Sequence, residues 1–266
     1  MNGAQLRAKM RNGERVIGTM TSFVRNPRWA GVYGRIGFDY VIVDTEHSPT
    51  SRGEAADLAA AFQNEGICPI IRVPTTEPSE AIKGLDAGFH GVLVPYCESA
   101  EEVHAVVHAA RMRPLKGALH IQARDLGTYP SPASEQYLKE RNANVVVIIG
   151  IESAPAIENL EAILNVPGID AIFIGPNDLS ISLGVPDQYD HPKFTEAVEH
   201  IIATADKHGL PAGGHWFEER IVDHWMSKGS RFILFYSDAR ALTEGYRHSI
   251  AKFRGATKQE EIKETI

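Results

Sequence analysis

Short apolar runs alternate with longer amphipathic segments along almost the whole chain. Several of the short runs, such as Val145–Ile149 and Ala171–Ile174, are continuously apolar and rich in β-branched residues. Such runs are typical of parallel strands that are buried on both faces of a sheet. The pattern predicts eight strands, namely Val16–Thr21, Tyr40–Asp44, Ile67–Val73, Gly91–Pro95, Val145–Ile151, Ala171–Ile174, Pro211–Gly214 and Phe232–Tyr236.

The segments between these runs have the apolar spacing of amphipathic helices. Proline or a capping residue opens several of them, as at Pro27, Pro78 and Ser99. Eight alternating strand–helix units favour a closed (β/α)8 barrel, and an open doubly wound sheet is the alternative fold. The clearest predicted helices are Arg52–Glu65, Glu101–Met112, Ala156–Leu164 and Lys193–His208.

Two segments interrupt the alternation. Residues 113–143 form a long connection rich in proline, glycine and polar groups, which is typical of a functional lid or a disordered segment. The highly charged tail Lys252–Ile266 has the composition of a solvated helix or a frayed end. Because a (β/α)8 barrel typically needs about 250 residues, the 266 residues fit a single barrel domain over the whole chain.

Composition and charge argue against several classes of protein. The chain is 43% hydrophobic and 23% charged, which is ordinary for a globular protein. A formal charge of −7, without long runs of lysine or arginine, argues against nucleic-acid binding. Neither a membrane span nor a signal peptide is evident. The two cysteines, Cys68 and Cys97, do not form a disulfide scaffold, so we expect a cytoplasmic protein in which both are small core or mouth residues.

Polar residues gather where the predicted strands end. In a (β/α)8 barrel the carboxyl ends of the strands form one mouth, and the chemistry takes place there. We therefore expect these side chains to lie together although they are far apart in the sequence. They are Asp44, Glu46 and His47 after the second strand, Arg72 in the third, Glu152 after the fifth, Pro176, Asn177 and Asp178 after the sixth, and His215 after the seventh.

The carboxylates of Glu152 and Asp178 follow consecutive strands, so they can approach each other. An oxygen-rich pair without cysteine or clustered histidine suits Mg²⁺ or Mn²⁺, with water and substrate oxygens as further ligands. The alternative is that each carboxylate caps a helix. Arg72 can grip a substrate carboxylate through two hydrogen bonds, beside backbone N–H groups of the turn at Asn177. A structural ion pair is the alternative for Arg72.

The positions of histidines and lysines favour some reaction types and argue against others. His47 lies beside two acidic residues that can set its tautomer and pKa, as a general base requires, although a structural role is the alternative. His104 and His108 lack the intervening glutamate of a zinc protease motif, because Ala105 occupies its place. No lysine falls within a predicted strand, which argues against Schiff-base chemistry.

Several segments resemble, in order and spacing, the HpcH/HpaI aldolases, which are metal-dependent class II pyruvate aldolases. The resemblance extends from about residue 14 to residue 250. It rests most firmly on the pairing of VDTEHSP with FIGPNDLS. The segments are GFDYVIVDTEHSP (Gly37–Pro49), IIRVP (Ile70–Pro74), IKGLDAG (Ile82–Gly88), GVLVPYCESAEE (Gly91–Glu102), IGIES (Ile149–Ser153) and GIDAIFIGPNDLSISLG (Gly168–Gly184).

The resemblance implies a site and a reaction. Glu152 and Asp178 would bind the divalent metal, Mg²⁺ or Mn²⁺ first and Co²⁺ or Zn²⁺ as alternatives. The backbone of Pro176, Asn177 and Asp178 would hold a substrate carboxylate. Such enzymes cleave 4-hydroxy-2-oxo acids to pyruvate and an aldehyde through a metal-stabilised enolate, and they catalyse the reverse addition.

The same resemblance assigns the remaining catalytic roles. Arg72 would bind the pyruvyl group and stabilise the enolate charge. His47 would be the acid/base, supported by Asp86 and with Asp44 nearby. Members of the family assemble as hexamers built from dimers that exchange C-terminal helices, which suits the segment Ser237–Phe253.

Three departures from the family pattern leave the substrate open. Gly150 stands where the family usually has glutamine, and Leu115–His120 reads LKGALH where a G-x-R-G stretch is common. The end of the seventh strand, Gly213–Phe217, is also unusual. The alternatives to a pyruvate aldolase are therefore an oxaloacetate decarboxylase, an enzyme that adds the enolate to another electrophile, and a barrel that only binds a 2-oxo acid.

Overall fold

Residues 1–254 are described by the computed structural model of the chain. Their strands close into one barrel in the order β1 to β8, and every neighbouring pair is parallel. The predicted (β/α)8 fold is thus confirmed, and the open sheet is excluded. The strands are β1 Val16–Thr21, β2 Tyr40–Asp44, β3 Cys68–Arg72, β4 Gly91–Val94, β5 Val146–Gly150, β6 Ala171–Ile174, β7 Ala212–Trp216 and β8 Phe232–Ser237.

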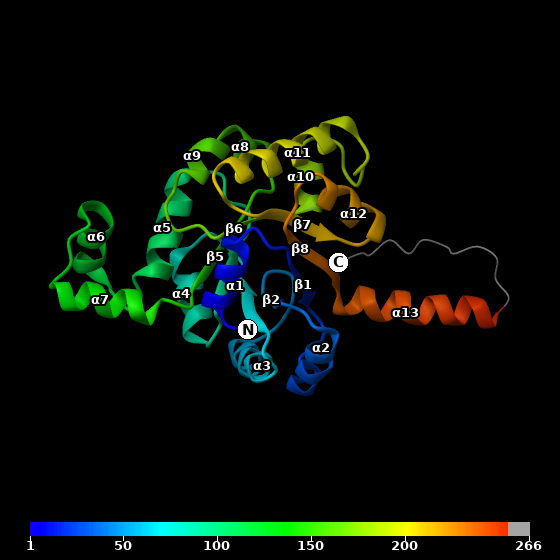
Figure 1. Ribbon diagram of the computed structural model, residues 1–266, viewed down its shortest axis with the longest axis horizontal. Coiled ribbons are helices and arrows are strands. Elements are labelled where there is room, and N and C mark those ends of the chain that lie inside the picture. Colours follow the sequence, from blue (N-terminus) through cyan, green and yellow to red (C-terminus); the bar gives the residue numbers. More distant parts are fainter. Residues whose placement is uncertain (255–266) are drawn as a thin grey trace.

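Helices surround the barrel (Figure 1). Serine residues cap several of them, and Ser51 and Ser99 each form a capping box with a glutamate three residues later. The predicted helix Ala156–Leu164 is divided at Asn159 into two short ones. The helices are α1 Gly3–Arg11, α2 Ala30–Ile36, α3 Arg52–Asn64, α4 Pro78–Asp86, α5 Ala100–Arg111, α6 Gly117–Leu126, α7 Pro132–Arg141, α8 Ala154–Glu158, α9 Leu160–Leu164, α10 Pro176–Ser182, α11 Pro192–Lys207, α12 Glu219–Ser227 and α13 Asp238–Phe253.

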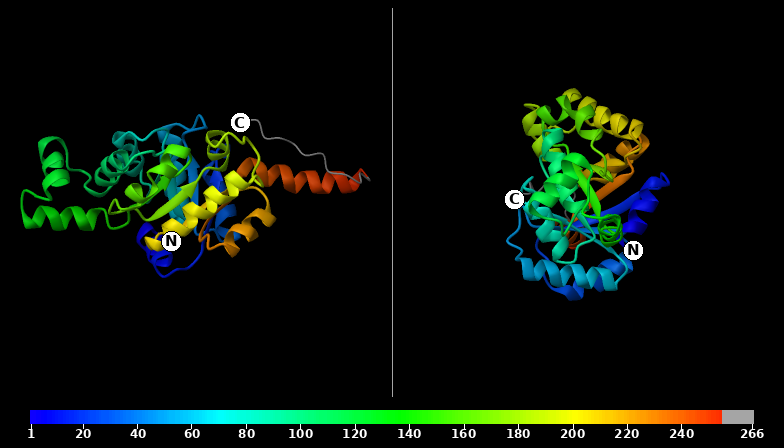
Figure 2. Two further views of the ribbon diagram at one scale, coloured as in Figure 1. Left: turned by 90° about the horizontal axis from the view of Figure 1, so that it is seen from above. Right: turned by 90° about the vertical axis from the view of Figure 1, so that its left-hand side faces the viewer.

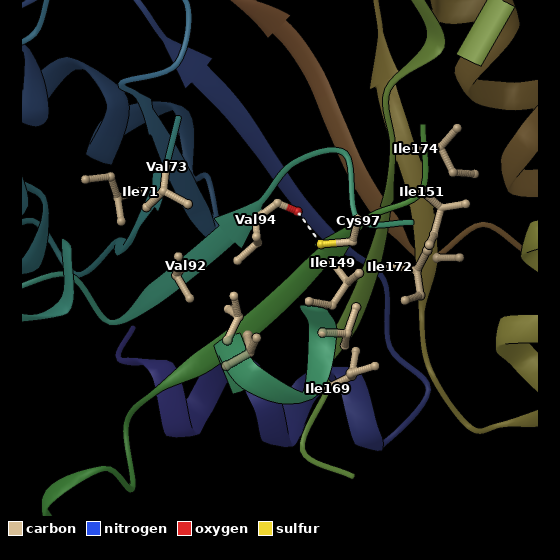
Figure 3. Packing of buried hydrophobic residues seen from close by; sticks show 14 of the residues in the cluster. Ile71, Val73, Val92, Val94, Cys97, Ile149, Ile151, Ile169, Ile172 and Ile174 are labelled. Atoms are coloured by element: carbon tan, nitrogen blue, oxygen red, sulfur yellow. Dashed lines mark hydrogen bonds between the residues drawn. The ribbon is translucent and has the colours of Figure 1, made fainter. Parts of the chain in front are cut away.

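Two apolar layers hold the barrel together. The outer layer lies between the strands and the helices, and Figure 3 shows part of it around Val94, Ile149 and Ile172. The inner layer fills the barrel, where Tyr40 stacks on Phe232 with ring centroids 4.7 Å apart. Alternation of side chains along each strand supplies both layers at once. This explains why the strands are continuously apolar in the sequence.

The amino-terminal end of the barrel is closed by α1. Leu6 and Met10 of this helix belong to the inner apolar cluster. Arg7, from the same helix, is paired with the buried carboxylate of Asp170 at a distance of 3.1 Å. The barrel is therefore plugged at this end, and the opposite end, where the strands terminate, carries the open mouth.

The connection 113–143 is not the lid or disordered loop that its composition predicts. It forms α6 and α7, which project from the barrel (Figures 1 and 2). Proline and glycine residues led to the expectation of a loop, but here they lie at helix boundaries. Pro132 opens α7, and Gly127 ends α6 with φ 61°. The connection joins the end of α5 to the start of β5, so within one protomer it does not cover the mouth.

Helix α13 extends away from the barrel on the side opposite to α6 and α7 (Figures 1 and 2). It begins at the carboxyl end of β8, and Ser237 caps its first turn. The sequence prediction for the tail Lys252–Ile266 falls mainly on residues 255–266, which lie outside the described residues. No helix within residues 1–254 is both long and apolar enough to cross a membrane.

Candidate active site

A cavity of about 420 Å³ opens at the carboxyl ends of the strands. Most of the side chains that the sequence places there are present, which confirms that they share one mouth. The cavity also contains apolar side chains that the sequence analysis did not single out. Its lining comprises Met20, Ser22, Phe23, Asp44, His47, Arg72, Glu152, Phe173, Gly175, Pro176, Asn177, Asp178, His215, Phe217, Ser237, Ala239 and Thr243.

Arg72 is held in the mouth by two carboxylates. The register of β2 and β3 puts Arg72 directly beside Asp44. Nε and Nη2 donate to the two oxygens of Asp44 at 2.8 and 2.7 Å, and Nη1 lies 3.2 Å from Oε2 of Glu46. An arginine side chain has five N–H donors, so two of them remain available to a ligand.

Asp44 positions its neighbours instead of moving protons. Burial by itself raises the pKa of Asp44, but the hydrogen bonds and charge of Arg72 outweigh burial and hold the pKa below its usual value. The same carboxylate accepts hydrogen bonds from the backbone N–H groups of Glu46 and His47. It therefore fixes both the guanidinium and the loop that carries His47.

Glu152 is a buried carboxylate with few partners. Its side chain is 2% exposed, and Oε1 accepts one weak hydrogen bond, from the backbone N–H of Tyr96 at 3.3 Å. Burial raises the pKa of Glu152 to about 8, the nearby charge of Asp178 adds to the rise, and Arg72 opposes it. A carboxylate this poorly compensated favours a bound cation or a proton.

Two glycines make room for the carboxylate of Glu152. A Cβ atom on Gly150 would lie 2.3 Å from Oε1, and one on Gly175 would lie 2.4 Å from Oε2. Both distances are far below van der Waals contact. Gly150, which departs from the family pattern, therefore leaves the space that the Glu152 side chain occupies in this chain.

Asp178 lies in the first turn of α10, half-buried at the cavity wall. The helix starts with Pro176 at the cavity wall and has no side-chain cap, so the backbone N–H groups of its first turn have no capping side chain as partner. The side-chain oxygen of Asn177 accepts a hydrogen bond from Tyr189. The side-chain oxygen of Asn177 is therefore engaged, and its side-chain and backbone N–H groups are the donors that it can offer to a ligand.

The donor set in the mouth fits a hard divalent cation. Within residues 1–254, no group of three or more histidine, cysteine, aspartate or glutamate side chains is arranged to hold a metal alone. Glu152 and Asp178 supply two carboxylates, which is the usual protein share for Mg²⁺, since this ion keeps several water or substrate ligands. The raised pKa of Glu152 supports the same fit.

His47 lies at the rim of the cavity. Its side chain is 47% exposed, and Nε2 is 3.6 Å from Oε2 of Glu46. The ring can therefore exchange protons with both solvent and a molecule in the cavity. Glu46, and not Asp86, is the acidic residue next to His47 in this protomer.

Asp86 lies away from the mouth of its own protomer, so the support of His47 that the sequence analysis assigned to it stays a prediction. It is the last residue of α4, which runs back from the end of β3 toward the start of β4. The side chain is 52% exposed and lies 3.5 Å from Arg113. The helix direction places Asp86 at the amino-terminal end of the barrel, so it cannot support His47 of the same chain.

The sequence analysis missed the contribution of Asp238. This carboxylate is 5% exposed at the start of α13 and accepts hydrogen bonds from the backbone N–H groups of Ser22, Phe23 and Val24. It thereby holds the loop after β1, which places Phe23 at the cavity. The rule that identified the other site residues applies here too, because Asp238 directly follows the last strand.

Comparison with known proteins identifies the family. The family model described as HpcH/HpaI aldolase/citrate lyase matches residues 22–243. The chain belongs to this family. The 5-keto-4-deoxy-D-glucarate aldolase of Klebsiella pneumoniae is 33% identical over 216 residues, which cover 80% of this chain and 82% of the relative. Membership and this likeness make the chain an enzyme of the carbon–carbon lyase type.

Solved structures of the family share the fold. The HpcH/HpaI aldolase from Desulfitobacterium hafniense superposes with a TM-score of 0.81 at 29% identity, covering 96% of this chain and 99% of that one. The citrate synthase SbnG superposes with a TM-score of 0.79 at 28% identity, covering 94% and 97%. The solved structures that this chain resembles thus include a protein named citrate synthase as well as an aldolase.

Proposed function

We propose that this chain is a divalent-metal-dependent aldolase that cleaves and forms 4-hydroxy-2-oxo acids, with pyruvate and an aldehyde as the cleavage products. The observation that carries the proposal is the buried carboxylate of Glu152 beside Asp178, in the same cavity as Arg72. The resemblance to a 5-keto-4-deoxy-D-glucarate aldolase supports it. The family is generally dependent on divalent metals.

Glu152 and Asp178 would hold the metal ion, Mg²⁺ or Mn²⁺ first and Co²⁺ or Zn²⁺ as alternatives. When bound, such an ion polarises the ketone and stabilises negative charge on the oxygen of the 2-oxo acid. The backbone of the first turn of α10, from Pro176 to Asp178, would hold the substrate carboxylate. The N–H groups come from Asn177 and Asp178, because proline has none.

Arg72 would bind the substrate, and His47 would transfer the proton. The two free N–H donors of Arg72 bind the pyruvyl oxygens and favour the enolate, whose negative charge is greater at that position than in the ground state. Asp44 orients Arg72 for this task. His47, at the rim, takes the proton from the 4-hydroxyl group during cleavage and returns it during addition.

The test is exchange of the pyruvate methyl protons, followed by NMR in D₂O with Mg²⁺. Exchange reports enolate formation and needs no knowledge of the aldehyde. We expect exchange in the wild type, and we expect EDTA or the substitution Asp178→Ala to abolish it. Asp190→Ala is the matched control, because this carboxylate is 86% exposed and lies outside the cavity lining. A folded, Mg²⁺-loaded wild type without exchange would exclude the proposal.

A second candidate keeps the enolate and changes its partner. The likeness to the citrate synthase SbnG favours addition of the enolate to another electrophile. Decarboxylation of oxaloacetate is a further reaction that passes through the same enolate, because loss of CO₂ generates it. Both alternatives retain the methyl exchange of pyruvate, so the products formed from oxaloacetate and from aldehydes distinguish them from an aldolase.

The assembly that we propose is a hexamer built from dimers, with α13 exchanged between two copies. Four apolar side chains recur on this helix at a spacing that puts them on one face. These side chains are exposed in one protomer. A contiguous patch of large exposed apolar side chains usually marks a surface that a partner covers. They are Leu242 (43% exposed), Tyr246 (69%), Ile250 (44%) and Phe253 (82%). Both cysteines are free and buried, which fits the cytoplasmic setting that we propose.

A further inference from the structure

His215 lies at the end of β7 and lines the mouth cavity. Its Nε2 atom is 3.0 Å from the backbone carbonyl oxygen of Tyr236. A carbonyl oxygen only accepts hydrogen bonds, so Nε2 carries the proton in this contact. In a neutral ring, the other nitrogen, Nδ1, is then a hydrogen-bond acceptor.

The ring of His215 is neutral and fixed. Burial lowers its pKa to about 4, and the charge of Arg72 acts in the same direction, although the hydrogen bond to Tyr236 partly opposes them. The carbonyl oxygen of Tyr236 also accepts a hydrogen bond from Oγ1 of Thr19 at 3.1 Å. Phe217 packs on the ring with centroids 4.4 Å apart.

The acceptor Nδ1 is left for a ligand. It has no hydrogen-bond partner within residues 1–254, and it is not one of the polar atoms that are sealed from solvent without a partner. The side chain lines the same cavity as Arg72 and Asp178. A hydroxyl group of a bound molecule can therefore donate to Nδ1.

The rest of this part of the cavity is apolar or already engaged. Phe23 and Phe217 line it, and Arg72 is its only lysine or arginine side chain within the described residues. Arg72 is already bound to Asp44 and Glu46.

We propose that His215 determines specificity for a hydroxyl-bearing aldehyde, whose hydroxyl group donates a hydrogen bond to Nδ1. The inference rests on the proposed aldolase function and adds the residue that recognises the second substrate. An aldehyde that lacks the hydroxyl group leaves a buried acceptor unpaired.

The experiment compares kcat/KM for the addition of pyruvate to glyceraldehyde and to propanal, which have the same carbon chain with and without hydroxyl groups. Each enzyme is described by the ratio of the two values, so a general loss of activity cancels. The wild type is expected to prefer glyceraldehyde to propanal at least about tenfold.

Two substitutions separate the two nitrogens of His215. In His215→Gln the side-chain amide replaces Nε2 and keeps the contact with Tyr236, but no acceptor stands at the position of Nδ1. In His215→Asn the amide oxygen replaces Nδ1. We expect the glyceraldehyde-to-propanal ratio to fall about tenfold in His215→Gln and to stay within about threefold of the wild-type ratio in His215→Asn.

An equal ratio in the wild type and both variants would overturn the inference, as would a wild type that prefers propanal. The proposed function is tested separately by exchange of the pyruvate methyl protons, which involves no aldehyde. Wild-type exchange combined with an unchanged ratio refutes only the role of His215. Absence of exchange refutes the aldolase itself.

Discussion

The guanidinium of Arg72 and the carboxylate of Asp44 are joined by two parallel hydrogen bonds of 2.8 and 2.7 Å. Both groups are buried, with side chains 11% and 1% exposed. They are adjacent because Asp44 ends β2 and Arg72 ends β3 in matching register. A buried charge that loses its partner is strongly destabilising, so each residue depends on the other.

The substitution Asp44→Ala is expected to lower the free energy of unfolding by about 3–5 kcal/mol. It should also slow pyruvate methyl exchange by a factor of about a hundred or more, because Arg72 loses its orientation. Urea denaturation and NMR measure the two effects. Glu199→Ala, which breaks an exposed pair with Lys228, is the control and should change neither quantity. An Asp44→Ala variant as stable and active as the wild type would contradict the assigned role.

The raised pKa of Glu152 predicts a pH-dependent stability in metal-free protein. Its folded-state pKa of about 8 exceeds the ordinary value of 4.5. Between these two values the folded state binds more protons than the unfolded state, so the free energy of unfolding falls as the pH rises. The contribution is fully present below about pH 4.5 and is lost by about pH 8, and it amounts to at most about 5 kcal/mol.

Thermal denaturation in EDTA between about pH 5 and pH 8.5 measures this effect. The variant Glu152→Gln cannot ionise at this position, so its melting temperature should fall less across the same range. Addition of Mg²⁺ at high pH should restore stability to the wild type and not to Glu152→Gln. If the melting temperatures of the two proteins in EDTA change identically with pH, ionisation of Glu152 does not destabilise the folded protein, which would contradict the prediction.

The space at Gly150 predicts the effect of a side chain there. A Cβ atom would also lie 3.0 Å from Cα of Pro95, so the backbone limits how far the site can relax. We expect Gly150→Ala to displace Glu152, lower the free energy of unfolding by about 1–3 kcal/mol and weaken Mg²⁺-dependent exchange. Equilibrium denaturation and a Mg²⁺ titration of the exchange rate measure these changes.

Gly53→Ala is the matched control for Gly150→Ala. Gly53 lies in α3, and its added Cβ would have no neighbour within 4 Å. In a helix, alanine is more favourable than glycine by about 0.5–1 kcal/mol, so Gly53→Ala should preserve or raise stability. If Gly150→Ala behaves like this control, Glu152 does not need the space.

The exposed apolar face of α13 predicts an association. Leu242→Asp combined with Tyr246→Asp places two charges on the face that we propose a second copy covers. The variant is expected to run as a smaller species than the wild type in size-exclusion chromatography with light scattering.

Lys252→Asp is the matched charge control for this double variant. Lys252 is an exposed residue of α13 that is not one of the four apolar side chains of the face. Replacing a lysine by an aspartate changes the net charge by the same amount as the two substitutions together, so the control should keep the wild-type mass. An unchanged mass for the double variant would contradict the proposed exchange of helices.

The sequence by itself determined the barrel and most of the site. Strands buried on both faces leave continuous apolar runs, and the residues after each run lie at one mouth because all strands are parallel. This reasoning placed Arg72, Glu152 and Asp178 together although 106 positions separate the first from the last. It requires only local patterns and one rule about the fold.

Only the tertiary structure decided how these residues are paired. Contacts such as Asp44 with Arg72, or Asp238 with the loop after β1, join residues that no local pattern relates. The direction of α4 places Asp86 away from the mouth of its own protomer. In residues 113–143, the residues at the helix boundaries have the composition of a loop, so the pattern did not predict α6 and α7. The neutral form of His215 depends on burial, and its tautomer depends on a carbonyl group 21 residues away. Burial, charge compensation and hydrogen-bond direction are properties of the packed chain, and the local pattern does not contain them.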